Sequence, residues 1–131
     1  MTIIGLGPGD DDLLTVSTLN AIQAISTQFI RTTRHPAARA MPCATSFDHH
    51  YEASDRFDQV YAAIVDDLVS AALVAQAARV VYAVPGSPTV AERTVVLLRE
   101  HPAVVDGRVT LTVHPSVSFL DLAFATLGVD R

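Results

Sequence analysis

The chain has 131 residues, is 50% hydrophobic and carries a formal net charge of −5. This length suits one domain with a substantial core. The negative charge and the absence of a basic cluster exclude a typical nucleic-acid surface, and no apolar run is long enough for a membrane helix. No basic region opens the chain as in a signal peptide, and a single cysteine, Cys43, excludes an internal disulfide. We therefore expect a cytoplasmic protein.

Strand and helix patterns alternate along the chain. In order, they predict a strand at Thr2–Leu6, a helix at Leu13–Ile25, a strand at Gln28–Thr32, a short helical turn at Arg34–Arg39, a weak strand at Thr45–Asp48, a long helix at Phe57–Ala77, a buried strand at Arg79–Val84, a helix at Thr89–His101, a strand at Arg108–Val113, and a turn and helix over Pro115–Leu127. Strands that alternate with helices form right-handed βαβ units. We therefore predict a three-layer α/β/α unit with a mainly parallel sheet of about five strands.

The first strand runs into a glycine-rich turn, Gly5–Asp10, whose sequence limits its ligands. No lysine follows the glycines, as a phosphate-binding loop would need, and Asp10 stands where a dinucleotide fingerprint requires a small residue. Asp10, Asp11 and Asp12 would cap the next helix and repel a phosphate. The second strand is not followed by a suitable acidic residue either, so a NAD-type site is disfavoured.

Two further turns, Pro85–Pro88 and His114–Ser118, also follow apolar strands. Ligands of parallel sheets bind where the strands end, so the three turns predict one site at that edge. The turns are rich in glycine, proline and serine, which lets their backbone approach a ligand closely. They are poor in acids, bases and nucleophiles. Such a site suits a small polar cofactor, and methyl transfer from a sulfonium donor needs little beyond binding and orientation.

Five segments in this order resemble the N-terminal half of a tetrapyrrole (corrin/porphyrin) methylase domain. They are IIGLGPGDDDLLT, IRTTRHPAA, SFDHHYEASDRFDQVYAAIVDDLV, VVYAVPGSPTVAERTVVLL and VHPSVSFLDLAFATLGVD, and they cover nearly the whole chain. The branch that the chain resembles most is the methylase-like domain fused ahead of MazG-type nucleotide pyrophosphohydrolases. Residues 1–131 would then form the N-terminal subdomain, with the second subdomain and any MazG domain absent from this chain.

The resemblance implies an S-adenosylmethionine-dependent methyltransferase, whose cofactor lies between two α/β subdomains. By position, the residues implied to bind the cofactor are Pro8, Pro85, Gly86, Ser87, Val90, Ser118 and Phe119. The catalytic residues and the small-molecule methyl acceptor stay unknown. Methylases of the family are usually homodimers, which predicts a homodimer here. Its contacts are expected near Leu127 and along Phe47–Tyr51.

Two residues depart from the family pattern. Ser87 stands where many active members carry aspartate, and Ser116 replaces the glycine of the third turn. Together with the missing second half, Ser87 supports an alternative function. In that alternative the chain is a non-catalytic regulatory or docking module associated with a MazG-type nucleoside triphosphate pyrophosphohydrolase.

Several polar residues have simpler structural interpretations. Ser87 and Pro88 resemble a helix start, and Thr89 with Glu92 fits a capping box. His35 is expected to top a short helix rather than act as a base.

The remaining polar residues predict no metal site. Asp48, His49 and His50 would point to opposite sides of an extended, loop-like segment, and no second cluster supports them. Asp66 and Asp67 read as a solvated helix face, and Cys43 as a buried structural cysteine.

Overall fold

The computed structural model describes residues 1–75 and 79–128 and contains one five-stranded sheet. Its strands are β1 (Thr2–Gly5), β2 (Thr27–Ile30), β3 (Thr45–Ser46), β4 (Val80–Val84) and β5 (Thr112–Val113). They lie in the order β3-β2-β4-β1-β5, and every neighbouring pair is parallel. The predicted α/β fold with a parallel sheet is confirmed. The central strands β4 and β1 therefore end at the same edge.

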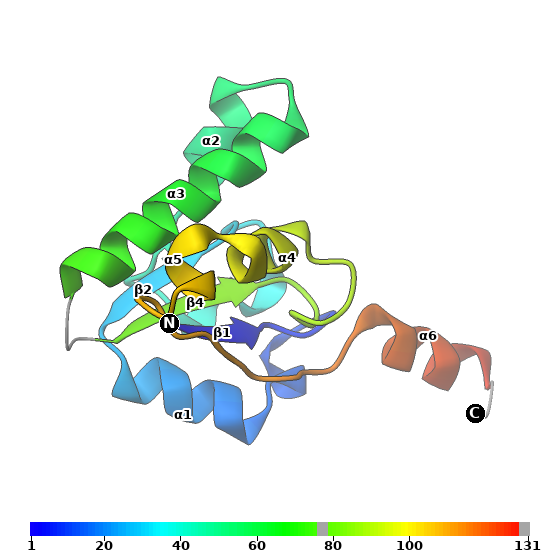
Figure 1. Cartoon of the computed structure of the whole chain (residues 1–131). Coiled ribbons are helices and arrows are strands. Elements are labelled where there is room, and N and C mark those ends of the chain that lie inside the picture. Colours follow the sequence, from blue (N-terminus) through cyan, green and yellow to red (C-terminus); the bar gives the residue numbers. More distant parts are fainter. Residues whose placement is uncertain (76–78, 129–131) are drawn as a thin grey trace.

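Helices cover both faces of this sheet (Figure 1). On one side lies α1 (Val16–Ala24), next to the 3₁₀ helices η1 (Asp11–Leu13) and η2 (Pro36–Ala40). On the other side lie α3 (Phe57–Ala75), α4 (Arg93–Glu100) and α5 (Pro102–Val105), and α2 (Asp48–Ala53) packs on α3. The last helix, α6 (Phe119–Leu127), projects away from the body.

The core follows the two-residue period of the strands. On β1, Ile3 packs with Tyr82 towards α3, whereas Ile4 packs with Val81 and Ala83 towards α1. All residues of β4 are buried, as its continuous apolar sequence predicted. The two apolar layers hold the sheet and fix the edge at which the turns emerge.

The N-terminal boundaries of two elements differ from the predictions. The helix expected from Leu13 begins at Val16, because the Thr15 hydroxyl caps it by accepting the Thr18 backbone N–H, and η1 precedes it. The helix expected from Thr89 begins only at Arg93. Ala91 has a φ of 54°, a left-handed conformation that interrupts a right-handed helix.

Two edge strands are shorter than predicted. The strand expected at Arg108–Val113 keeps only Thr112–Val113, and the one expected at Thr45–Asp48 ends at Ser46. The following segment is the helix α2 rather than a loop. The long helix is described to Ala75, and the last two residues of its predicted span, 76 and 77, lie outside the described residues.

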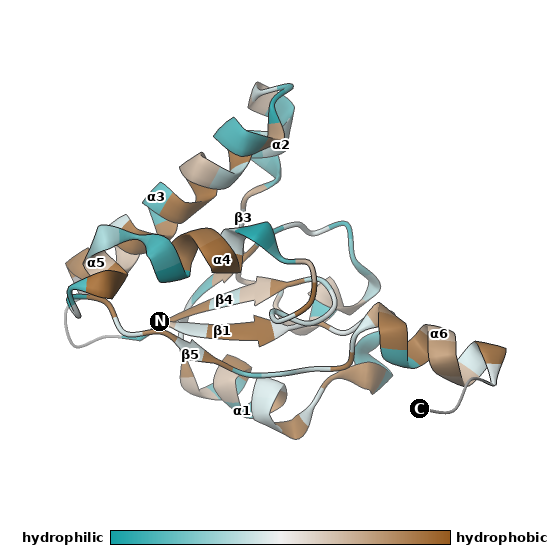
Figure 2. Ribbon diagram, turned by 45° about the vertical axis from the view of Figure 1, so that its right-hand side comes forward, coloured by the Kyte–Doolittle hydropathy of each residue, from teal (hydrophilic) through white to brown (hydrophobic). Residues whose placement is uncertain are grey.

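Helix α6 has strong local signals but little tertiary cover. Ser118 and Asp121 form a reciprocal capping box, and Gly128 ends the helix with a left-handed φ of 67°. Its apolar side chains, which dominate its colour in Figure 2, are largely exposed. Within residues 1–75 and 79–128, no helix combines the length and apolarity that crossing a membrane requires.

Candidate functional site

A cavity of about 310 Å³ lies at the edge where β1, β4 and β2 end. The three turns predicted from the sequence all contribute to it. It is lined by every residue that the family resemblance implied, namely Pro8, Pro85, Gly86, Ser87, Val90, Ser118 and Phe119. The sequence therefore located the lining of one cavity from segments that lie far apart in the chain.

Hydrogen bonds join these turns around Gly7 and Gly86. The Gly7 N–H donates to the Gly86 carbonyl at 3.0 Å, and the Gly86 N–H donates to the Gly7 carbonyl at 2.9 Å. The Ser116 hydroxyl also donates to the Gly86 carbonyl, at 2.8 Å. Ser116, the departure from the family pattern, thus ties the third turn to the second. The backbone of these turns was expected to face a ligand. The N–H and C=O groups of Gly7 and Gly86 are instead hydrogen-bonded within the protein.

Gly5, the last residue of β1, makes this junction possible. A Cβ atom at Gly5 would lie 2.0 Å from the Ser116 Oγ and 2.3 Å from the Gly86 carbonyl oxygen. Both contacts are far inside van der Waals distance, and one of them is with backbone. Only glycine lets the second and third turns close over the end of β1.

An ion pair that the sequence did not reveal forms part of the cavity wall. Arg31 Nη1 lies 2.7 Å from Glu92 Oε2, and the Glu92 side chain is only 4% exposed. The other Glu92 oxygen accepts a hydrogen bond from the Thr94 hydroxyl at 2.7 Å, and that hydroxyl lies 3.0 Å from the Tyr82 hydroxyl. The predicted capping box is wrong, because the Glu92 side chain makes no capping bond.

The electrostatics of this wall follow from burial. Burial lowers the pKa of Arg31, but the adjacent Glu92 carboxylate, together with Tyr51 and Tyr82, more than offsets this and raises the pKa above its usual value. Burial also raises the pKa of the Tyr82 phenol. Among the described residues, the buried Nε of Arg31 has no hydrogen-bond partner. This part of the wall therefore contains an ion pair and, at Arg31 Nε, one N–H donor without a partner among the described residues.

His35 also lines the cavity, and both of its ring nitrogens are occupied. Nε2 lies 2.8 Å from the Gly7 carbonyl, and Nδ1 accepts the Ala37 N–H at 3.0 Å. A carbonyl only accepts, so Nε2 is the donating nitrogen and Nδ1 the accepting one. His35 therefore caps η2, as predicted. The lining groups described here are arranged for binding rather than for proton transfer.

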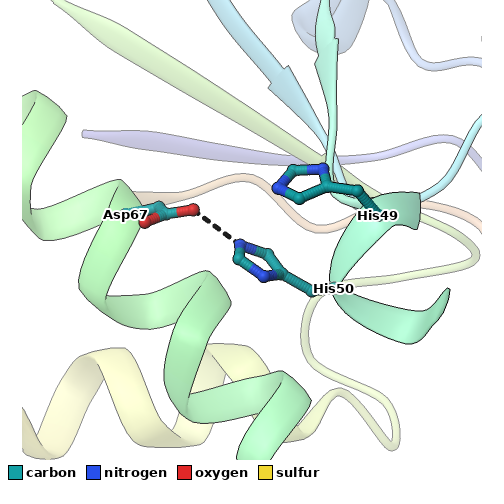
Figure 3. Close-up of side chains that lie close together, drawn as sticks. All are labelled: His49, His50 and Asp67. Atoms are coloured by element: carbon teal, nitrogen blue, oxygen red, sulfur yellow. Dashed lines mark hydrogen bonds and ion pairs between the residues drawn. The ribbon is translucent and has the colours of Figure 1, made fainter. Parts of the chain in front are cut away.

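Two minor expectations were wrong. Cys43 is exposed, not a buried structural residue. The argument against a metal at Asp48, His49 and His50 assumed an extended segment, but these residues belong to helix α2. Both histidine rings lie beside Asp67 of α3 in Figure 3.

The profile of the Tetrapyrrole (Corrin/Porphyrin) Methylases matches residues 1–130. The chain belongs to this family. This tetrapyrrole methylase-like chain is 40% identical over 134 residues to the uncharacterized protein YabN of Bacillus subtilis (strain 168), covering 99% of the chain and 26% of YabN.

Solved structures share the fold of this tetrapyrrole methylase-like chain. Diphthine synthase matches 98% of the chain with a TM-score of 0.68 and 19% identity, over 49% of its own length. Uroporphyrin-III C-methyltransferase from Thermus thermophilus, complexed with S-adenosylhomocysteine, matches 95% with a TM-score of 0.60 and 19% identity, over 50% of its length. The chain thus shares the fold of these two proteins and spans about half the length of each.

Proposed function

We propose that this chain is the S-adenosylmethionine-binding half of a methyltransferase of the tetrapyrrole methylase family. The observation that carries the proposal is the cavity in which all residues implied by the family come together. Its volume of about 310 Å³ lies at the lower end of the range of small-molecule sites, roughly 300–1,000 Å³. A cytoplasmic location, supported by the single cysteine, belongs to the same proposal.

The lining fits the chemistry of such a cofactor. When bound, S-adenosylmethionine supplies a methyl group already activated by a positively charged sulfur. Transfer then depends on position rather than on a protein base. Pro8, Val90 and Phe119 offer apolar surface for contact, and Ser87 and Ser118 add hydroxyls beside it. These side chains would hold and orient the cofactor. The methyl acceptor is not specified by the proposal.

Calorimetric titration with S-adenosylmethionine and S-adenosylhomocysteine tests this proposal. We expect heat of binding from the wild-type chain and its loss in Val90→Arg, whose long charged side chain would fill the cavity. Val96→Arg is the matched control, because Val96 is an exposed valine outside this cavity. Binding that survives Val90→Arg, or is lost equally in both variants, would contradict the assigned site.

The alternative is a non-catalytic docking module for a MazG-type pyrophosphohydrolase. The turn after β4 supports it, because it carries Ser87 in place of a carboxylate, and the Ser87 hydroxyl lies 3.0 Å from the Thr89 hydroxyl. No heat with either ligand at millimolar protein, combined with co-elution with a MazG domain, would favour this second function.

We also propose that two copies of the chain pair through α6. Its exposed apolar residues support this, since a two-fold contact would bury the same patch on both copies. The predicted contribution of the segment Phe47–Tyr51 stays a prediction, in which the Phe47 ring takes no part because it is 1% exposed.

Light scattering after size exclusion should give a mass above 14.0 kDa for the wild type and a monomer for Leu127→Asp. Val105→Asp on α5 is the control, as Val105 and Leu127 are both 73% exposed. A wild-type monomer at all dilutions would refute the pairing.

A further inference from the structure

Two histidines of α2 and one aspartate of α3 lie close together, and none of them lines the cavity of the three turns. Their nearest ligand atoms, one each from His49, His50 and Asp67, all lie within 4.8 Å of one another. His50 Nε2 is 2.6 Å from Asp67 Oδ2, and the two imidazole centroids are 4.2 Å apart. Figure 3 shows both rings on α2 facing the carboxylate on α3.

We propose that His49, His50 and Asp67 bind a divalent first-row transition metal ion, with Zn²⁺, Ni²⁺ and Cu²⁺ as the chemical class. Two imidazole nitrogens and one carboxylate oxygen form a donor set that these ions prefer. Water would complete the coordination, because His49 and Asp67 are exposed. The site is separate from the cavity of the three turns and does not depend on its proposed cofactor.

Only a small adjustment of the three side chains is needed for them to bind one metal ion. Ligand atoms around such an ion, each about 2.1 Å from it, lie roughly 3–3.5 Å from one another. The present separations, up to 4.8 Å, therefore close by a rotation of exposed side chains. His50 is already directed, because its ring packs 5.8 Å from Phe47 and its Nε2 faces Asp67.

A simple ion pair between α2 and α3 would explain this cluster less completely than a metal site. It accounts for His50 and Asp67 but gives no role to His49, whose ring lies beside that of His50. Asp48 is not part of the set, because one of its oxygens already accepts bonds from Thr33 and Ser46. Asp48 instead fixes the start of α2, which presents both histidines.

The test is a titration of the untagged full chain, freed of metal by a chelator, with Zn²⁺ and Ni²⁺ in separate calorimetric runs. We expect one site per chain and a rise in melting temperature on Zn²⁺ addition. His49→Ala and Asp67→Asn should each weaken binding at least about tenfold. Asp66→Asn is the matched control, because Asp66 is the exposed neighbour of Asp67 on the same helix, and its affinity should stay at the wild-type value.

Visible absorption of the Co²⁺-loaded chain gives a second readout, since coordination by histidine changes the spectrum of the aqueous ion. We expect the change in the wild type and in Asp66→Asn and its loss in His49→Ala. Circular dichroism confirms that each variant is folded. Absent binding at millimolar metal, or equal weakening by Asp66→Asn, or full affinity in His49→Ala would overturn the proposal and leave only a hydrogen bond between α2 and α3.

Discussion

Replacing Gly5 with alanine is expected to abolish ligand binding and to destabilise the fold by about 3 kcal/mol, at the upper end of the usual range for overpacking. The new Cβ would lie 2.0 Å from the Ser116 Oγ and 2.3 Å from the Gly86 carbonyl oxygen. Serine can rotate away, but the backbone oxygen moves only with the whole second turn. Urea denaturation measures the loss of stability, and titration with S-adenosylhomocysteine measures the site.

Gly9→Ala is the control for this substitution, because a Cβ there would meet only the Leu13 Cδ1, at 3.4 Å. It should unfold at nearly the wild-type urea concentration. Adding Ser116→Gly to Gly5→Ala should restore only part of the stability, since the contact with Gly86 persists. Wild-type stability of Gly5→Ala would mean that the turns do not close over β1 as described.

Replacing Arg31 with methionine is expected to cost about 3 kcal/mol of unfolding free energy, the lower end for a broken buried pair. The variant leaves the Glu92 carboxylate, 4% exposed, without its cation. We expect Arg31→Met combined with Glu92→Met to be more stable than Arg31→Met alone, because it removes both charges. Denaturation curves of the two variants measure the difference.

The exposed pair of Arg56 and Asp58 provides the comparison. Its side chains are 69% and 68% exposed, so Arg56→Met should leave the unfolding curve close to the wild type. If Arg31→Met were equally mild, water would be reaching Glu92 and the wall of the cavity would be open rather than closed.

The layers of the fold were predictable because they depend on local periodicity. The short β-branched run of β1 and the fully apolar β4 indicate buried strands without knowledge of their partners. The start of α4 was not predictable, since the left-handed Ala91 gives no sequence signal of the kind that glycine gives. Helix α2 also escaped prediction, because the bonds from Thr33 to Asp48 form only after folding.

The turns of the site could be predicted from the sequence, but the ion pair in its wall could not. Turns after parallel strands meet at one edge whatever their sequence, so a shared site could be inferred, and the family resemblance supplied its individual residues from Pro8 to Phe119. Arg31 and Glu92 lie 61 positions apart, and neither has a local pattern that points to the other. Thr89 with Glu92 even resembles a capping box, a signal that the buried ion pair overrides.

The Gly7–Gly86 junction determines how this cavity meets water. Each of the two carbonyls receives two donors, from Gly86 and His35 on one and from Gly7 and Ser116 on the other. A carbonyl has two lone pairs, so neither has a position left at which to hold a water molecule. This part of the cavity lining therefore binds no water through the two carbonyls, although it is made of peptide. A ligand that lies against it displaces no bound water there, and its selectivity must come from shape and from the surrounding walls.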